Sequence, residues 1–413
     1  MMRRHRELGG AVVAPPRPPA RRAEVNSALL AAVALTLVPA TAGAASRQVE
    51  IGVENLYYRT AASPLNRGNL LGLDPNEDLL RGTLHWREAR GRARGVFRGL
   101  VEQRIGGGDR TEWRAREAYL QYGFGEAVTV RAGRQRIAWG SGFAWNPTNR
   151  LEPPRNPLNT GLEQQGADAL RVDVIPAAWA GLIVVAARSR TGVSDLPFAN
   201  EGDERRTAAV RARFLVRETD VAAVVSGGRN QRTLVGLDVA RTLFGQVTAH
   251  VEASTYRGAE MPPARAEQRF VRIAAGLLYP RGEHTSWTIE YFFNGEGYGD
   301  DARDAWLGQL EGSVGEAYAA AATVPYSGGL GLRRHYIQGS WTRSAIGGRW
   351  TTALRAVFGA SDGGLALTPG IVYAPRGNLT VHLDAIVPIG PDDSEYRLAP
   401  FRAAVQARIR ALF

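Results

Sequence analysis

The side chains best placed to act on other molecules are arginines that recur at alternate positions in short segments of alternating polarity. Alternate residues of an extended strand share one face, so these guanidinium groups would form rows on one side of each segment. Rows of arginine that face a water-filled passage raise the local concentration of anions and select for them. The candidate residues are Arg81, Arg87, Arg94, Arg98, Arg131, Arg334 and Arg355, together with the carboxylates Glu252 and Glu290. The alternative is that the arginines pair with acids on the same face and only stiffen it.

A second feature is the segment 140–166, which carries more aromatic residues and prolines than a solvated loop needs. We expect it to fold inward and to narrow the passage. The residues expected to form this constriction are Trp139, Phe143, Trp145, Asn146 and Pro147. The alternative is an external loop that packs on its own aromatic residues.

Catalytic chemistry finds little support in the sequence. His250, Glu252 and Ser254 share one strand face and superficially offer a base and a nucleophile. Same-face neighbours on a strand lie roughly 7 Å apart, which is too far for direct hydrogen bonds. The chain also has no G-x-S-x-G elbow, Walker loop, H-E-x-x-H pair or convincing metal spacing. We therefore predict that the protein is not an enzyme and has no cofactor and no metal. We also predict no nucleic-acid partner, because only the arginine content would favour nucleic-acid binding.

The arginines, the two carboxylates and the residues at 250–254 named above lie in segments that alternate apolar and polar side chains with the period of a β-strand. About 18 such segments follow one another, with 16 to 18 as the expected range. The segments are 48–59, 79–89, 94–104, 112–124, 127–139, 167–175, 179–189, 207–216, 220–226, 233–241, 246–256, 269–279, 285–294, 333–343, 349–358, 365–374, 378–388 and 401–413. The face of the strand that carries Arg134 and Arg136 is ambiguous and is left open.

The connections between these segments alternate in length. Long ones such as 60–78, 140–166 and 295–332 are separated by short ones such as 125–126 and 375–377. This rhythm is typical of an outer-membrane barrel, with short periplasmic turns and long extracellular loops. Closure into a barrel also leaves no sheet edge exposed to lipid. We therefore predict an all-β fold, a transmembrane antiparallel up-and-down β-barrel, because a soluble sandwich or propeller does not explain the rhythm.

The longest connection contains a stretch with helical periodicity. Trp306, Leu310, Val314 and Tyr318 would share one face of a single helix there. Such a helix would cap the passage or lie on the surface, and the sequence leaves both possibilities open.

The start of the chain has the pattern of a secretory signal. An arginine pair at 21–22 precedes an apolar run, 28–38, and small residues at 42–44 supply a cleavage site. The run is shorter than the roughly 20 residues of a membrane-spanning helix. We predict a signal peptide over residues 1–44, cleaved after Ala44.

Composition is consistent with export. The chain contains no cysteine, which excludes disulfide frameworks and thiolate sites. Its 51 basic residues outnumber 40 acidic ones, and every basic residue is arginine. This excess gives mild support to a preference for anions. Residues 45–413 show no linker or change in composition, so we predict a single barrel domain there.

The final segment, 401–413, ends the chain on an aromatic residue. Val405 and Ile409 fall on one face and Arg408 on the other. The segment resembles the closing strand of Gram-negative outer-membrane barrels, whose terminal Phe is part of the signal read by the barrel assembly machinery. The resemblance gives Phe413 this role and predicts a location in the cell outer membrane.

Three further stretches carry a more specific resemblance. Residues 128–158 contain the strand R-x-G-R-Q-x-I-x-W-G, then N-P-T-N and a proline-rich continuation. Residues 290–299 read E-Y-F-F-N-G-E-G-Y-G, and the ending 362–413 fits the same group. The chain thus resembles a poorly characterised branch of the porin and alginate-export superfamily. The resemblance implies an outer-membrane channel of about 18 strands and leaves its substrate open.

These observations predict a porin-like channel for passive diffusion of small polar, anionic solutes. Its partners would be outer-membrane lipid and lipopolysaccharide, the barrel assembly machinery, and the solutes themselves. Two alternatives remain: an export channel for an anionic polysaccharide, and a structural or adhesive barrel with a plugged lumen. The oligomeric state is not predicted.

Overall fold

The computed structural model describes residues 46–69, 73–105, 110–152, 156–158, 165–190, 204–229, 231–259, 261, 267–322 and 331–413. These residues all belong to one compact unit. The predicted signal peptide, 1–44, lies outside them.

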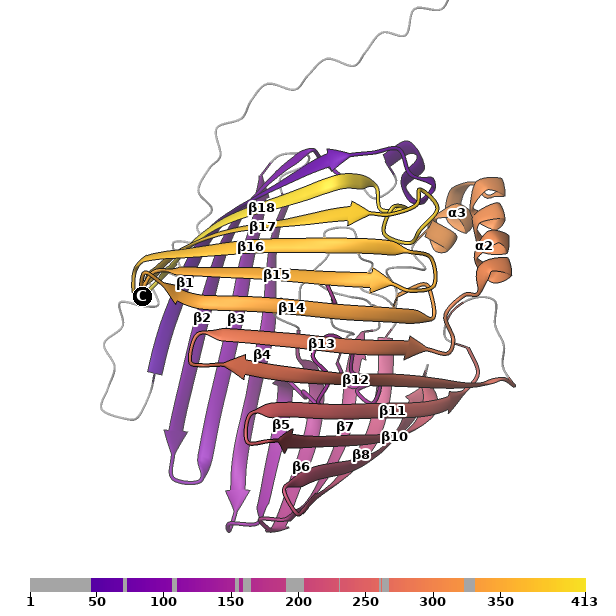
Figure 1. The fold of residues 1–413 in the computed structure, drawn as a ribbon. Coiled ribbons are helices and arrows are strands. Elements are labelled where there is room, and N and C mark those ends of the chain that lie inside the picture. Colours follow the sequence, from indigo (N-terminus) through magenta and orange to yellow (C-terminus); the bar gives the residue numbers. More distant parts are fainter. Residues whose placement is uncertain are drawn as a thin grey trace, which may run out of the picture. The chain divides into compact units, whose positions relative to one another are not determined.

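Eighteen antiparallel strands make up most of this part of the chain (Figure 1). The first nine are β1 (Ser46–Thr60), β2 (Asn76–Arg90), β3 (Ala93–Ile105), β4 (Arg110–Phe124), β5 (Val128–Gln135), β6 (Ala167–Ala177), β7 (Ala180–Arg190), β8 (Glu204–Val216) and β9 (Thr219–Arg229). The second nine are β10 (Gln231–Leu243), β11 (Val247–Arg257), β12 (Arg269–Arg281), β13 (Thr285–Asn294), β14 (His335–Ile346), β15 (Trp350–Gly359), β16 (Gly364–Arg376), β17 (Leu379–Ile389) and β18 (Phe401–Leu412). The predicted all-β class and the strand number are confirmed.

Each strand pairs with its neighbours in sequence, and the pairing of β18 with β1 closes the sheet into a ring. That last pairing places Glu50 opposite Leu412. Phe413 extends it, because its amide donates to the Val49 carbonyl at 2.8 Å and its carbonyl accepts from the Val49 amide at 3.0 Å. Closure gives every strand two partners, so no edge is left with hydrogen-bonding groups that lipid cannot satisfy.

Side chains alternate between two faces along the strands, as the sequence pattern predicts. One face carries apolar residues such as Val225, Ile289 and Leu383, whose exposed fractions are 50%, 53% and 48%. The other carries polar residues such as Asp238 and Glu290, which are buried. Contiguous exposed aliphatic side chains are unfavourable in water and favourable in lipid. The apolar face is therefore the outer face of the barrel.

Short and long connections alternate around the ring. Turns such as 91–92 and 125–127 join strands at one end, and segments such as 136–166 and 295–334 join them at the other. Gly125 begins one of the tight turns with a φ of +69°, a conformation that glycine adopts without strain. By the pattern of outer-membrane barrels we refer to the end with short turns as periplasmic and to the other as extracellular.

Strand β5 ends at Gln135, four residues before its predicted end at Trp139. Gly133, near this end, has a φ of +116°, and a Cβ there would lie 2.3 Å from the carbonyl oxygen of Ala118. Only glycine fits such a close approach. After Gln135 the chain leaves the wall, which makes the following loop longer than the sequence pattern predicts.

The two arginines whose face was ambiguous have different environments. Arg134 lies opposite Asp168 of β6, and its guanidinium binds both oxygens of that carboxylate at 2.8 Å. Leu170, which shares the face of Asp168, is 52% exposed, so this pair lies on the outer face. Arg136 lies beyond the strand and binds Glu152 at 2.9 Å.

The helices of the described residues lie in the extracellular connections (Figure 1). They are the 3-10 helix η2 (Pro64–Asn69) and the α-helices α2 (Asp300–Gly312) and α3 (Gly315–Ala322). The predicted single helix is wrong, because the chain breaks between α2 and α3 and leaves Val314 83% exposed. Trp306 and Tyr318 are buried together as expected, in a small core formed by the loops. No helix in this part of the chain is long and apolar enough to cross a membrane.

Candidate functional site

The connection between β5 and β6 enters the barrel interior, and we call its residues 136–152 the crossing loop. Its hydrogen bonds reach Asp238 on β10, Glu252 on β11 and Glu290 on β13. In the ring of 18 strands, β13 follows β5 by eight places, which puts it close to the opposite wall. The crossing loop therefore spans the interior and does not form a purely external loop.

Glu290 anchors the middle of the crossing loop. Its carboxylate accepts hydrogen bonds from the backbone amides of Phe143 at 2.5 Å, Ala144 at 3.1 Å and Trp145 at 2.9 Å. The Nε2 atom of His250 lies 3.0 Å from the same carboxylate. Glu290 is fully buried, so three amide dipoles and an imidazole replace water around its oxygen atoms.

Glu252 anchors the next part of the crossing loop in the same way. Its carboxylate accepts from the Thr148 amide at 2.7 Å, from the Thr148 hydroxyl at 2.6 Å and from the Gly142 amide at 3.3 Å. Gly140 passes so close that a Cβ on it would lie 2.5 Å from Oε2 of Glu252. The prediction that Glu252 and Glu290 line the passage is wrong, because the crossing loop covers both carboxylates.

Trp139 and Trp145 hold the crossing loop against the wall. Trp139 packs with Ala169 and Val185 on the inner face of β6 and β7. Trp145 stacks on Phe292 of β13, with ring centroids 4.9 Å apart and an interplanar angle of 10°. Both indoles are buried, so they anchor the crossing loop and do not present a surface to the passage.

The other three predicted constriction residues differ from one another in burial. Phe143 and Asn146 are half-buried, and Pro147 is buried. The Phe143 ring meets the His250 imidazole edge to face, with centroids 4.6 Å apart. Asn146 donates from Nδ2 to the Trp139 carbonyl at 2.9 Å. Of these three residues, Phe143 and Asn146 thus stay partly exposed.

The polar residues of β11 take structural roles at this site. His250, Glu252 and Ser254 share the inner face as predicted and are all buried. The imidazole of His250 contacts Glu290, and the carboxylate of Glu252 is occupied by the crossing loop. His250 and Glu252, which in the sequence belonged to a superficial catalytic group, therefore help to hold the loop in place.

Two predicted arginines on the inner face are bound to wall residues. Arg81 contacts Glu54 through Nη1 at 2.5 Å and Glu102 through Nε at 2.7 Å. Arg98 donates from Nε to Nε2 of His85 at 3.0 Å. For Arg81 the structure supports the alternative that arginine stiffens the wall, because two carboxylates neutralise its charge.

Arg131 and Arg355 differ from Arg81 in having neutral partners. Arg131 donates to Oε1 of Gln121 at 2.9 Å, and its guanidinium lies 4.8 Å from the centroid of the Tyr119 ring. Arg355 donates to the Leu158 carbonyl at 3.0 Å, so it contacts the part of the β5–β6 connection that follows the crossing loop. Neither has a carboxylate within 4.0 Å among the described residues.

The remaining predicted arginines lie near strand ends. Arg87 and Arg94 are exposed beside the periplasmic turn that joins β2 to β3. Arg334 precedes β14, is exposed, and donates to the Gly297 carbonyl at 3.0 Å. The expectation that Arg334 lies on a strand is wrong, because β14 begins one residue later.

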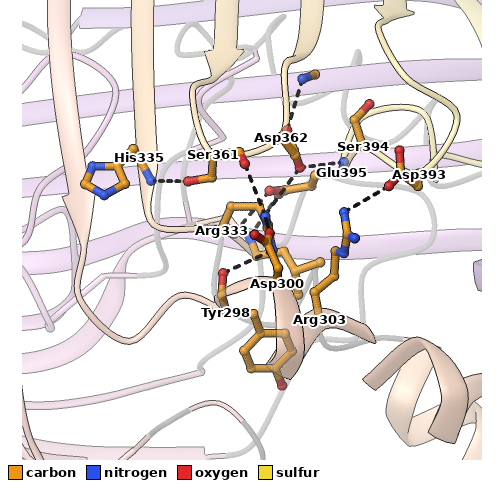
Figure 2. Close-up of polar contacts among 12 residues, drawn as sticks. Tyr298, Asp300, Arg303, Arg333, His335, Ser361, Asp362, Asp393, Ser394 and Glu395 are labelled. Atoms are coloured by element: carbon orange, nitrogen blue, oxygen red, sulfur yellow. Dashed lines mark hydrogen bonds and ion pairs between the residues drawn. The ribbon is translucent and has the colours of Figure 1, made fainter. Parts of the chain in front are cut away.

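A second polar cluster joins three extracellular connections (Figure 2). Buried Arg333 binds Asp300 at the start of α2 and lies 3.6 Å from Asp362 in the β15–β16 connection. It also donates to the carbonyls of Tyr298 and Ser361 at 3.2 Å. One guanidinium thus ties helix α2 to the ends of strands β14 and β15.

Glu395, in the connection between β17 and β18, completes this cluster (Figure 2). It accepts from the amides of Leu332 at 2.9 Å and Arg333 at 3.3 Å, and from the Tyr336 hydroxyl. Its own amide donates to Asp362 at 3.0 Å. Burial, the largest influence, raises the pKa of Glu395 to about 7.

Sequence reasoning named Glu252 and Glu290 but missed their role as anchors of the crossing loop, and it missed Asp238; one signal could have found this role. Asp238 and Glu252 stand directly opposite each other on β10 and β11. Like charges directly opposite destabilise a sheet unless other groups compensate them. Here Ser141 and Thr148 of the crossing loop donate to these carboxylates, and Arg211 lies 3.3 Å from Asp238.

A closed ring of 18 antiparallel strands with an apolar outer face defines a transmembrane antiparallel β-barrel. The solved structures that share this fold include the following three. OccAB1 of Acinetobacter baumannii aligns over 89% of this chain and 96% of its own, with a TM-score of 0.57 and 11% identity. OccK1 (OpdK) of Pseudomonas aeruginosa aligns over 90% and 98%, with a TM-score of 0.58 and 10% identity. The outer membrane protein OprD from Pseudomonas aeruginosa aligns over 89% and 93%, with a TM-score of 0.52 and 9% identity.

At these identities the likeness concerns the fold. It supports the porin part of the resemblance drawn from the sequence and not its alginate-export part. No family model matches the chain. No curated protein matches it either.

Proposed function

We propose that this protein is a passive outer-membrane channel for small polar solutes, with a preference for anions. The observation that carries the proposal is the crossing loop, held across the interior by Glu252 and Glu290. Barrels of 16 to 18 strands enclose a lumen wide enough for water. A loop anchored inside such a lumen narrows it and sets an upper limit on the size of a diffusing solute.

The preference for anions rests on Arg131 and Arg355. Both guanidinium groups face the interior with neutral hydrogen-bond partners, so their charge is not cancelled by an adjacent carboxylate. Arg355 also contacts the β5–β6 connection, which places one of these charges near the narrowed region. A positive charge beside a narrow aqueous path attracts anions and repels cations.

The proposal includes the outer membrane as location and its lipid as partner. The apolar outer face supports it, since residues such as Val53 and Leu237 are 54% and 49% exposed. Phe413 closes the ring and is itself 70% exposed. Cleavage after Ala44 and reading of Phe413 by the barrel assembly machinery remain parts of the proposal.

Two alternative functions receive less support. Export of a polysaccharide needs a path for a polymer, and buried carboxylates hold the crossing loop across that path. A structural or adhesive barrel with a plugged lumen would have the same anchored loop but no conductance. Measurement of conductance therefore separates this alternative from the channel.

The test is single-channel recording in a planar bilayer, with the full chain expressed in a Gram-negative host and purified from its outer membrane. We expect a steady conductance and, in a salt gradient, a reversal potential that indicates anion preference. Arg131→Gln with Arg355→Gln should weaken this preference. Arg217→Gln, in the exposed periplasmic turn between β8 and β9, removes an equal charge away from the lumen and should leave it unchanged. Absence of conductance from a folded barrel would overturn the proposal.

A further inference from the structure

The outer face of strands β5 to β9 ends in a row of charged side chains at its extracellular end. In the strand ladder each member of this row is directly opposite the next. The members, which we call the arginine row, are Arg134, Asp168, Arg188, Arg206 and Arg229. Because neighbouring strands lie 4.7–4.9 Å apart, the row extends over about 19 Å along the barrel surface.

Exposure shows that the arginine row faces outward. Val184, Val210 and Val225 lie four residues from row members on the same strands and are 43%, 42% and 50% exposed. An even separation places side chains on the same face of a strand. The arginine row therefore borders the apolar surface that contacts lipid.

The two ends of this surface are chemically different. Six residues nearer the periplasmic end, the same five strands carry an aliphatic row. Its members are Val128, Val174, Leu182, Ala212 and Ala223. Charge on the outer face of these five strands thus gathers toward the extracellular end.

The described neighbours of the arginine row neutralise only part of its charge. Asp168 binds Arg134, and Glu204 lies 2.5 Å from Arg188 and 3.1 Å from Arg206. Four guanidinium groups thus exceed the two carboxylates by two charges. Among the described residues, no carboxylate lies within 4.0 Å of Arg229, which stands directly opposite Arg206.

Among the described residues, this arrangement leaves positive charge that an anion from outside the chain would neutralise. Arg188 is directly opposite Arg206, which is directly opposite Arg229, and like charges so placed destabilise a sheet. Arg188 and Arg206 have side chains that are each 63% exposed, so their donors are accessible. Guanidinium groups bind phosphate through paired hydrogen bonds, which are among the strongest in proteins.

We propose that the arginine row binds the phosphate groups of lipopolysaccharide in the outer leaflet. The row lies about 20 Å along the strands from the aliphatic row, at 3.3–3.4 Å per residue. Because the strands of outer-membrane barrels tilt by about 35–45°, this distance corresponds to about 15 Å of an apolar band that is about 25 Å tall. The apolar outer face of these strands ends at the arginine row, which therefore stands where phosphorylated headgroups meet the hydrocarbon. The proposal concerns the lipid-facing surface and does not depend on what passes through the lumen.

The test measures binding of lipid A that carries both phosphates to the full-length barrel, purified in detergent and stripped of lipid. The variant combines Arg188→Gln, Arg206→Gln and Arg229→Gln. Loss of three charge-assisted contacts should weaken binding by at least about tenfold. Binding by the unmodified protein should also fall with added salt, because exposed ionic contacts are screened.

A matched control variant removes the same charge at the other end of the barrel. Arg241, Arg281 and Arg343 are exposed, lie on the outer face near periplasmic turns, and are replaced together by Gln. This variant should bind lipid A within about twofold of the unmodified protein, because its three arginines do not stand opposite one another and form no continuous row; Arg281 and Arg343 are both opposite Thr285. An equal loss in both variants would mean nonspecific charge attraction and would overturn the proposal.

Two further arms separate the remaining explanations. Lipid A without its phosphates should bind much more weakly, and inorganic phosphate alone should compete poorly because it lacks the acyl chains. If the dephosphorylated lipid binds as well, or if the variant changes oligomeric state without changing lipid binding, the proposal fails. Should the triple variant not fold, Arg229→Gln alone is used, and unchanged binding by this single variant also counts against the proposal.

Discussion

Replacement of Glu290 by alanine should release the crossing loop and widen the channel. The carboxylate of Glu290 accepts the amides of Phe143, Ala144 and Trp145, and without it these buried groups lose their acceptor. Each buried donor left unsatisfied costs about 1–3 kcal/mol. Three of them give at least about 3 kcal/mol, which shifts the equilibrium between docked and released loop by on the order of 100-fold.

Single-channel recording and liposome swelling with sugars of increasing size measure this release. We expect a larger conductance, stronger open-state fluctuations and a larger size limit for Glu290→Ala. Trp145 stays stacked on Phe292, so the fluctuations should be the most sensitive readout. Glu290→Gln keeps one acceptor oxygen and the same shape, and its effect should be intermediate.

The matched control is Glu102→Ala, which removes an inner-face carboxylate that binds Arg81. Its effect on the size limit should be small, because Glu102 is not among the anchors of the crossing loop. Folding of every variant is checked by heat-modifiable migration on gels. A folded Glu290→Ala barrel with unchanged conductance, fluctuations and size limit would refute the reasoning that buried carboxylates hold the constriction.

Three other predictions follow from the same contacts. Arg131→Gln combined with Arg355→Gln should move the reversal potential in a salt gradient toward zero, the value of a channel that does not distinguish anions from cations. The reason is that both guanidinium groups have neutral partners, so their charge acts on passing ions. Gly140→Ala should displace the crossing loop and raise conductance, because the added methyl would lie 2.5 Å from a Glu252 oxygen at a φ of +87°. Burial raises the pKa of Glu395 from its ordinary 4.5 to about 7, so between these values the native state holds more protons than the unfolded state. The stability of the extracellular cluster should therefore fall as pH rises through this window, which hydrogen exchange corrected for intrinsic rates can measure, and Glu395→Gln should remove the trend.

The architecture of this protein could be predicted from its sequence because strand alternation is a local property. Side chains two residues apart share a face, so the outward position of Ile409 and the inward position of Arg408 follow from the backbone geometry alone. The lengths of connections are equally local, and they predicted the closed ring of 18 strands that the structure confirms. Where local patterns were irregular, as after Gly133, the predicted strand end was wrong.

The environment of each polar side chain depends instead on residues far away in the chain. Glu290 and Glu252 were placed on the correct face, yet the groups that cover them come from 145 and 104 residues earlier. Arg81 and Arg131 have similar sequence surroundings, and the register of neighbouring strands decides their partners. Arg81 binds two carboxylates, whereas Arg131 contacts the Gln121 amide and the Tyr119 ring. Alternation decides whether a side chain faces the lumen, whereas tertiary contacts decide whether its charge is buried, neutralised or available to a passing ion.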